Sequence, residues 1–391
     1  MKKRITVVFL LALTAMVLTS CVIFLPQSAK EHFGETEPSG TEVSSVGPDG
    51  STSAVEADPS GLKAEELAVF SDPSMLPMQF AISEDGKFVC LLQDYKRTYS
   101  KISVGNSASE LNIVYDAGDF YIKNMACGNG FTAWTELTDD AFAVKCYNHA
   151  KNETSVIRSG HYDFNTDYQI LVVKAYKDNI YYPLYNNDDE YASIMCYNVP
   201  SGSESAYMSA DFFMPDRMVS AQYECLDLND GWLLCSERTA TGKQDFRMIN
   251  LDDESNILAH LNPNVSLVYG ASYDAAGSIL ALYYWDTNSV DHIGLCSGSA
   301  AITDVVDFSS SAVAYRDRIR YIDGVLYYVE QTEKNGTANN FRFCVVTNNG
   351  EDTSYYADAF SYFIADDGSI YLLTRDSGWN SVSLKRLEPG V

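Results

Sequence analysis

The sequence is short of basic residues, of histidine and of long apolar runs, and each shortage excludes a class of protein. Its 27 Lys and Arg residues stand against 53 Asp and Glu residues, which gives a formal net charge of −26. A field of that sign repels a phosphate backbone, so we expect no nucleic acid partner. After residue 20 no run approaches the roughly 18–20 apolar residues that a membrane-spanning helix needs, so we expect no span there.

Signatures of catalysis and metal binding are also missing. The five histidines are scattered, and the chain contains no H-E-x-x-H, G-x-S-x-G or P-loop motif. It has no C-x-x-C pair, the usual sign of a structural zinc site. We therefore predict a protein that is not an enzyme and that uses no metal and no cofactor. The alternative is a hydrolase or lyase for glycans or peptides, with two carboxylates on the rim of the fold.

The N-terminal segment predicts export and a lipid anchor. Residues 1–20 combine a charged start with an apolar stretch, the pattern of a secretory signal peptide. The sequence LTSC at 18–21 resembles the lipobox of bacterial lipoproteins. The resemblance implies that Cys21 is acylated and that membrane lipid holds the protein outside the cytoplasm. The anchoring membrane would be the cell membrane, or the outer membrane in an organism that has one. An ordinary signal peptide beside a coincidental cysteine is the alternative.

Residues 21–61 differ in composition from everything that follows. They are rich in Gly, Ser, Thr, Pro and Glu and contain little apolar material to bury. This composition predicts a disordered tether, and about 40 such residues span roughly 35 Å root-mean-square. We therefore expect a spacer that holds a folded domain at 62–391 away from the membrane.

A short phrase recurs through that domain and predicts its architecture. A turn residue is followed each time by an apolar and aromatic run, as in ADDGSIYLLT at 365–374. Gly and Asn suit such turns because they tolerate positive φ. Four antiparallel strands in each repeat of this length would form one blade of a β-propeller. The turn positions lie 44 to 52 residues apart and are Gly86, Gly130, Asn179, Gly231, Gly277, Gly324 and Gly368.

The two ends of the repeat predict how the ring closes. The last copy, 358–391, has room for three strands, and an orphan strand at 62–71 precedes the first copy. Pairing the two would complete the last blade and remove an open sheet edge. We therefore predict an all-β fold, a single β-propeller of about seven four-stranded blades, the last closed by the N-terminal strand. Six or eight blades are alternatives, and the strand-rich runs disfavour a helical solenoid.

The repeated phrase also carries a family resemblance. D-G-x-I/L-Y-Y followed by I-x-C/R-x-N/D resembles bacterial secreted propellers of the TolB-like or low-density-lipoprotein-receptor-type families, over most of residues 75–391. The resemblance implies a ligand site at one mouth of the central channel, on loops that join second and third strands. Aromatic faces stack on sugars or pack against peptides, and charged groups orient them. The candidate ligand-binding residues on these loops are Tyr95, Arg97, Asp140, Arg238, Trp285, Asp286, Arg375 and Trp379.

The alternative for these eight residues is a structural role in solvated loops. Eight cysteines besides Cys21 remain, and most lie inside apolar phrases, which predicts buried thiols instead of disulfides. Cys225 and Cys235 flank one hairpin and are the pair to test for a disulfide.

The sequence as a whole predicts a membrane-anchored surface lipoprotein that binds or scaffolds a peptide, a glycan or an envelope partner. An accessory subunit of an envelope complex, the role of TolB-like propellers, is a further alternative.

Overall fold

The computed structural model describes much of residues 56–388. The described ranges are 56–57, 62–94, 99–118, 120–138, 140–161, 172–186, 191–209, 227–238, 244–260, 265–288, 290–297, 302–308, 312–334, 338–347 and 352–388. Cys21, the predicted signal peptide and the predicted tether apart from 56–57 lie outside these ranges. Within the ranges, no helix has the length and apolar character that crossing a membrane requires.

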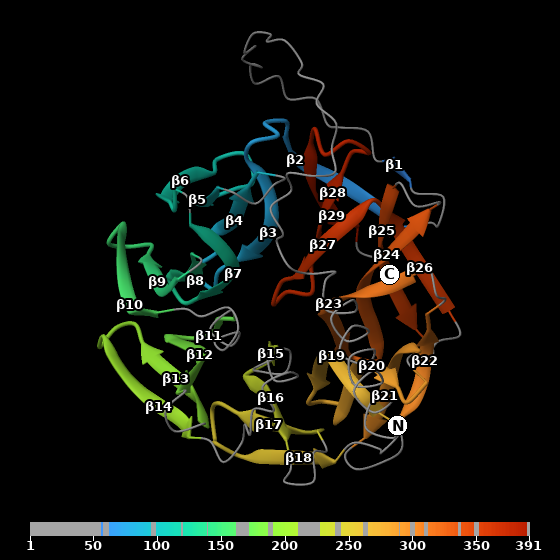
Figure 1. The fold of residues 1–391 in the computed structure, drawn as a ribbon. Coiled ribbons are helices and arrows are strands. Elements are labelled where there is room, and N and C mark those ends of the chain that lie inside the picture. The colour runs from blue at the N-terminus through green and yellow to red at the C-terminus, as the bar shows by residue number, and fades with distance from the viewer. Residues whose placement is uncertain are drawn as a thin grey trace, which may run out of the picture. The chain divides into compact units, whose positions relative to one another are not determined.

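Seven antiparallel sheets form the blades of a propeller, which confirms the predicted fold and blade number (Figure 1). Six of them consist of four strands that are consecutive in the chain. Their bounds are, for blade 1, β3 (Leu76–Ile82), β4 (Phe88–Gln93), β5 (Ser100–Gly105) and β6 (Asn112–Asp116); for blade 2, β7 (Tyr121–Gly128), β8 (Phe131–Leu137), β9 (Ala141–Asn148) and β10 (Glu153–His161); for blade 3, β11 (Lys174–Tyr176), β12 (Asn179–Asn186), β13 (Tyr191–Asn198) and β14 (Ser203–Ser209); for blade 4, β15 (Asp227–Asn229), β16 (Trp232–Arg238), β17 (Gln244–Asn250) and β18 (Asn256–His260); for blade 5, β19 (Val265–Asp274), β20 (Ile279–Asp286), β21 (Asp291–Ser297) and β22 (Thr303–Asp307); for blade 6, β23 (Ala312–Ile322), β24 (Val325–Lys334), β25 (Ala338–Thr347) and β26 (Asp352–Ala357).

The seventh blade joins the two ends of the folded chain, as the sequence predicts. Its strands are β27 (Ala359–Ile364), β28 (Ile370–Arg375), β29 (Val382–Leu387) and the N-terminal β2 (Lys63–Phe70). β2 pairs antiparallel with β29, and Arg386 of β29 forms an ion pair with Glu65 of β2 at 2.7 Å. A fifth strand, β1 (Glu56–Ala57), pairs with β2. β1 lies within residues 21–61, the segment predicted as a tether. β27 lies beside β3 of blade 1, so the ring is closed.

Burial follows the position of a strand within its blade. The second strand is covered by neighbouring blades on both faces, so it is a nearly continuous apolar run. All seven residues of β8 are buried, and five of six in β4. No residue of β10, the outermost strand of its blade, is buried. The propeller core is therefore a series of layers between blades.

Side chains also join neighbouring blades directly. Trp134 of blade 2 is fully buried, with its ring 4.8 Å from that of Tyr115 in blade 1. Burying a large apolar side chain contributes roughly 1.5–3 kcal/mol. Around the channel, polar side chains of one first strand accept backbone N–H bonds from the next. These bonds are Met125 N to Gln79 Oε1 at 3.1 Å, Val173 N to Asn124 Oδ1 at 2.9 Å and Tyr321 N to Ser272 Oγ at 3.2 Å.

The turns between first and second strands lie at the predicted positions, but two use a different residue for positive φ. Blades 4 and 6 have Asp-Gly turns in which both residues have positive φ, 45° and 74° at Asp230 and Gly231 in the first case. In blade 3 the positive φ belongs to Lys177 and not to Asn179, which already lies in β12. In blade 5 it belongs to Ser278, the residue after Gly277.

The cysteines lie where the repeat predicts. Third strands of four blades carry one each, and Cys90 lies in a second strand. Burial raises the pKa of these thiols, to about 12 for Cys146 and to about 11 for Cys296, so they are neutral apolar groups at physiological pH. Cys225 lies outside the described ranges, so its pairing with Cys235 stays a prediction.

Candidate functional site

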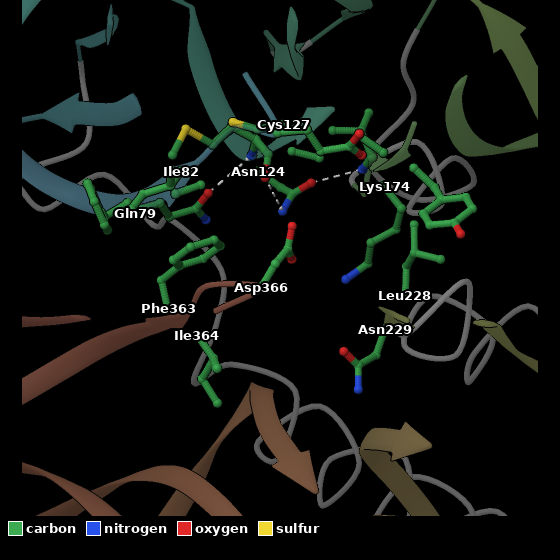
Figure 2. Close-up of a pocket in the computed structure, with 18 of the residues that line it drawn as sticks. Gln79, Ile82, Asn124, Cys127, Lys174, Leu228, Asn229, Phe363, Ile364 and Asp366 are labelled. Carbon is green, nitrogen blue, oxygen red and sulfur yellow. Dashed lines mark hydrogen bonds between the residues drawn. The ribbon is translucent and has the colours of Figure 1, made fainter. Parts of the chain in front are cut away.

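A cavity of about 800 Å³ lies in the central channel, at the end where first strands turn into second strands. Its walls come from β3, β7, β11, β15, β23 and β27 or from the turns that follow them, so six of the seven blades contribute. Figure 2 shows Lys174, Asn229 and Asp366 pointing into one opening from three different blades. First strands all run toward the same end of the channel, so residues equally far before their turns lie at similar depth.

Below the mouth, a buried carboxylate links three blades. Asp227 of β15 is 1% exposed and accepts a hydrogen bond at Oδ1 from Arg320 of β23. The Arg320 side chain therefore reaches from blade 6 to blade 4, past blade 5. Lys174 of β11 lies on the other side, with Nζ 3.9 Å from the same Oδ1 atom. A carboxylate buried this deeply needs such cations, because an uncompensated charge in the interior is costly.

The mouth of the cavity is acidic. Asp230 and Asp366, in the turns of blades 4 and 7, both line the cavity and are exposed. Partial desolvation at the mouth raises the pKa of the Asp230 carboxyl, and like charges nearby raise it further. These charges belong to Asp366, Asp274 and Asp323. Carboxylates of several blades therefore lie near enough to disfavour the charge of Asp230.

Lys177 lies at the mouth of the cavity and is positively charged. Acidic neighbours bind its ammonium group and its backbone N–H. Its Nζ lies 2.6 Å from Asp252 Oδ1, and its backbone N–H donates to Glu84 Oε1 at 2.9 Å. Tyr176 donates its hydroxyl hydrogen to the other Asp252 oxygen at 2.9 Å. These contacts raise the pKa of Lys177 and lower that of Asp252. The mouth therefore stays predominantly negative despite this lysine.

The remaining wall is mixed. Ile82, Phe363 and Ile364 give it an apolar side, and the amide of Asn229 provides both a donor and an acceptor (Figure 2). Few convergent polar groups among apolar ones are typical of small-molecule and peptide sites. The cavity can hold a ligand that carries charge and also buries apolar surface.

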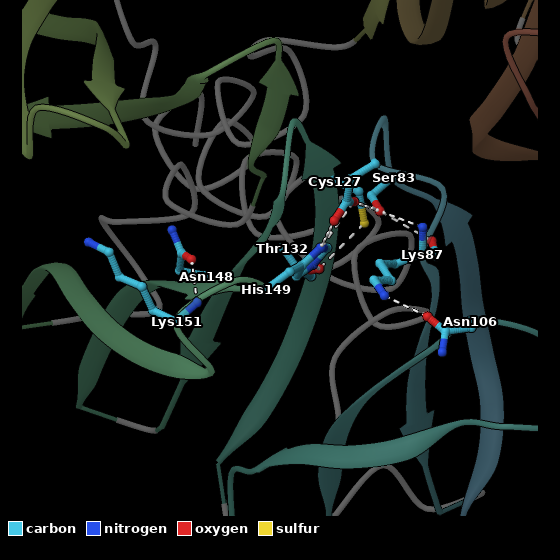
Figure 3. A network of polar contacts seen from close by, with 9 residues as sticks. Ser83, Lys87, Asn106, Cys127, Thr132, Asn148, His149 and Lys151 are labelled. Carbon is cyan, nitrogen blue, oxygen red and sulfur yellow. Dashed lines mark hydrogen bonds and ion pairs between the residues drawn. The ribbon is translucent and has the colours of Figure 1, made fainter.

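A second polar network lies at the same end of the channel (Figure 3). His149 Nδ1 is 2.9 Å from Asp85 Oδ2, and His149 Nε2 is 2.9 Å from Thr132 Oγ1. The carboxylate favours a proton on Nδ1, which leaves Nε2 to accept the Thr132 hydroxyl hydrogen. Thr132 is fully buried, and its hydroxyl is 3.8 Å from the Cys127 thiol.

This chain of groups resembles an acid–base relay but ends on groups unsuited to attack. Thr132 cannot reach a substrate because it is fully buried. Burial, more than any neighbour, raises the pKa of the Cys127 thiol to about 12, so it is not a thiolate at neutral pH. The network connects the first turn of blade 1 with blade 2, and its chemistry is that of a structural clamp.

The predicted loop residues that the structure describes lie at the opposite end of the strands from the cavity, and none of them lines it. Arg375 and Trp379 come together, with the guanidinium carbon 4.6 Å from the indole centroid. Trp379 also packs 4.9 Å from the Phe360 ring. Their packing accounts for both residues structurally.

Two more of the predicted residues organise their own turns. Asp286 Oδ1 accepts backbone N–H bonds from Asn288 and Val290, both at 2.8 Å. Asp140 accepts the hydroxyl hydrogen of Thr138 at 3.0 Å. The remaining members are Trp285 at the end of β20, Arg238 at the end of β16, whose side chain is not described, and Tyr95 and Arg97, which lie outside the described ranges. A ligand role for the eight residues stays a prediction.

The sequence analysis missed the charged residues of the cavity, although a signal for them exists. Lys174, Asp227 and Arg320 each lie three positions before the residue that opens their turn. Blades 1 and 2 have Ile82 and Ala126 at the matching positions. When the repeats are aligned, this position is charged in some copies and apolar in others. A charged residue there indicates a side chain on the wall of the channel.

No family model and no curated protein matches this sequence. Among solved structures, it is similar to the β-propeller domain of the Trilobed protease from Pyrococcus furiosus, with a TM-score of 0.51, 8% identity, and coverage of 81% of this chain and 94% of that one. TolB from Acinetobacter baumannii gives a TM-score of 0.43 and 9% identity over 70% of this chain and 63% of that one. An acylaminoacyl peptidase gives a TM-score of 0.46 and 8% identity, over 81% of this chain and 52% of that one.

The likeness to the Pyrococcus domain supports the propeller fold and extends no further at this identity. That domain has an open velcro topology. Here the pairing of β2 with β29 closes the last blade. The two propellers therefore differ in how the ring is completed.

Proposed function

We propose that this protein is a membrane-anchored, extracytoplasmic lipoprotein that binds a peptide in the central cavity of its propeller without catalysing a reaction. The observation that carries the proposal is the cavity of about 800 Å³, whose charged, amide and apolar groups converge from six blades. Ligand pockets have volumes of about 300–1,000 Å³ and use convergent polar groups to fix the orientation of the ligand. A site built on strands is also rigid, which reduces the entropy lost on binding.

The anchoring part of the proposal rests on the lipobox resemblance at 18–21. Each lipid CH₂ group buried in a bilayer contributes about 0.8 kcal/mol, so two or more acyl chains on Cys21 would hold the protein at the membrane. The predicted tether would then present the cavity to partners away from the lipid surface.

The experiment is a thermal-shift screen of the full chain in detergent against peptides, glycans and divalent cations. A ligand at a hundredfold excess over its dissociation constant stabilises the fold by about 2.7 kcal/mol. Asn229→Ala in the cavity should abolish the shift, and Asp140→Asn at the opposite end should preserve it. The reverse result would place the site on the loops predicted from sequence, and a flat screen would contradict the proposal.

One observation favours a hydrolase as the second candidate. Asp230 has a raised pKa and faces the charge of Asp366 across the mouth. A carboxyl with a raised pKa can act as a general acid, and a second carboxylate nearby can act as the base. Turnover of a screened ligand that disappears in both Asp230→Asn and Asp366→Asn would favour this reading over simple binding.

A further inference from the structure

The cavity has two layers of charge at different depths. Lys174, on β11, lies three residues before the turn residue of its blade, and Asp227 lies three residues before Asp230. A strand rises about 3.3 Å per residue, so the two layers are separated by about 10 Å along the channel. The separation is fixed by backbone, because both layers lie on first strands or their turns.

The deeper layer offers a cation. Arg320 already donates to Asp227 Oδ1, and the Lys174 ammonium stays 3.9 Å from that atom. This distance is too long for a hydrogen bond. Among the described residues, Lys174 makes no hydrogen bond through its ammonium group, so its donors remain for a ligand. Figure 2 shows this side chain extending into the opening.

The outer layer offers anions. Asp230 and Asp366 line the cavity and make no ion pair with any of the described residues. Their mutual repulsion is relieved when a cation lies between them. Lys177 does not supply that cation, because its ammonium is 2.6 Å from Asp252.

An anion at the deep layer and a cation at the mouth, about 10 Å apart, describe the two ends of a short peptide. Three extended residues span about 10 Å, since each adds at most about 3.3–3.6 Å. Between the layers, Phe363 and Ile364 provide an apolar wall for side chains. We propose that the cavity binds a free peptide of about three residues, with its carboxylate on Lys174 and its ammonium group between Asp230 and Asp366. This inference rests on the proposed function and adds the length of the peptide and the recognition of its two charged ends.

The test is calorimetric titration of the full chain in detergent with alanyl-phenylalanyl-alanine and three blocked forms of it. These are the N-acetylated, the C-amidated and the doubly blocked peptide. The free peptide should bind most tightly, and each single block should weaken binding about tenfold or more, as loss of a charged hydrogen bond does.

Variants assign each end of the peptide. In Lys174→Met the amidated and free-acid peptides should bind equally, whereas Lys174→Arg should keep the preference for the acid. In Asp366→Asn the acetylated and free peptides should come closer in affinity. Thermal unfolding of each variant checks that the fold is intact, and the conservative Lys174→Arg serves if Lys174→Met unfolds.

Failure of this inference differs from failure of the proposed function. If the doubly blocked peptide binds as well as the free one and Asn229→Ala abolishes both, the cavity binds peptides but does not read their ends. If no form binds while another compound in the screen does, the cavity is a site for a different ligand class. Either result would contradict the proposal that the cavity binds a peptide through both of its charged ends.

Discussion

The negative charge of Asp230 has two opposite effects. It destabilises the fold, but the proposed site needs it to bind the ammonium group of the peptide. Burial, and then the charges of Asp366, Asp274 and Asp323, raise its pKa above the unfolded value of 3.8. A carboxyl with a raised pKa favours folding while protonated, and that advantage is lost as the pH rises through the folded-state pKa. At neutral pH the ionised Asp230 therefore destabilises the propeller.

Asp230→Asn should accordingly raise the thermal midpoint at pH 7, by about 1–2 °C because the side chain is partly screened by solvent. The gain should vanish below the unfolded pKa, where aspartic acid and asparagine are both neutral. The same variant should bind the free peptide more weakly. Differential scanning calorimetry at several pH values measures the first effect, and an unchanged or lower midpoint at pH 7 would contradict it.

At the scale of the element, the closing strand is the one on which the ring depends. β2 supplies the fourth strand of blade 7; Leu62, just before it, is 5% exposed, and Ala64, within it, is 4% exposed. Without β2, β29 would present an unpaired edge and the core of blade 7 would open.

A chain that starts at residue 72 lacks β2, whereas one that starts at residue 58 lacks β1 alone. We expect the shorter chain to lose about 3 kcal/mol or more of unfolding free energy, from the burial of Leu62 and the pairing of six residues of β2 with β29. The longer chain should unfold at nearly the same denaturant concentration as the full chain. Equal stability of the two truncated chains would show that β2 does not close the ring.

The elements were also the scale at which the sequence was most informative. A turn glycine before an apolar run is a local signal, so Gly86 and Gly368 could be assigned from neighbouring residues alone. Where the turn chemistry changed, the residue with positive φ moved by one or two positions, to Lys177 and to Ser278. Backbone conformation at a single residue depends on the whole turn, which a repeat pattern specifies less tightly than strand order.

Repeated burial of cysteine gives a prediction of its own. Burial raises the pKa of Cys146 and Cys344 to about 12, that of Cys296 to about 11, and that of Cys90 further. Thiol reagents attack the thiolate, so these cysteines should label at least a hundredfold more slowly in the folded protein than in denaturant. Mass spectrometry after timed alkylation resolves each site. Fast labelling of any of the four in the folded protein would contradict the burial seen here.

At the scale of the whole molecule, the candidate site could not be predicted from spacing. Lys174, Asp227 and Arg320 come from blades 3, 4 and 6 and meet only because the ring brings first strands together. The residues chosen from sequence share a loop type, and those that the structure describes lie at the other end of the strands. Ring closure converts distances of 93 residues along the chain, as between Asp227 and Arg320, into direct contact.

The location of the molecule gives the last prediction. If Cys21 carries the acyl chains that the lipobox resemblance implies, the wild-type protein should partition into the membrane fraction and stay there in high salt. High salt removes proteins held by charge, and this chain, with a net charge of −26, has little attraction to anionic lipid. Cys21→Ser should release the protein into the soluble fraction with its thermal midpoint unchanged, because residue 21 lies far along the chain from β2. Retention of Cys21→Ser in salt-washed membranes would instead show an anchor within the apolar stretch of residues 1–20 or a membrane partner.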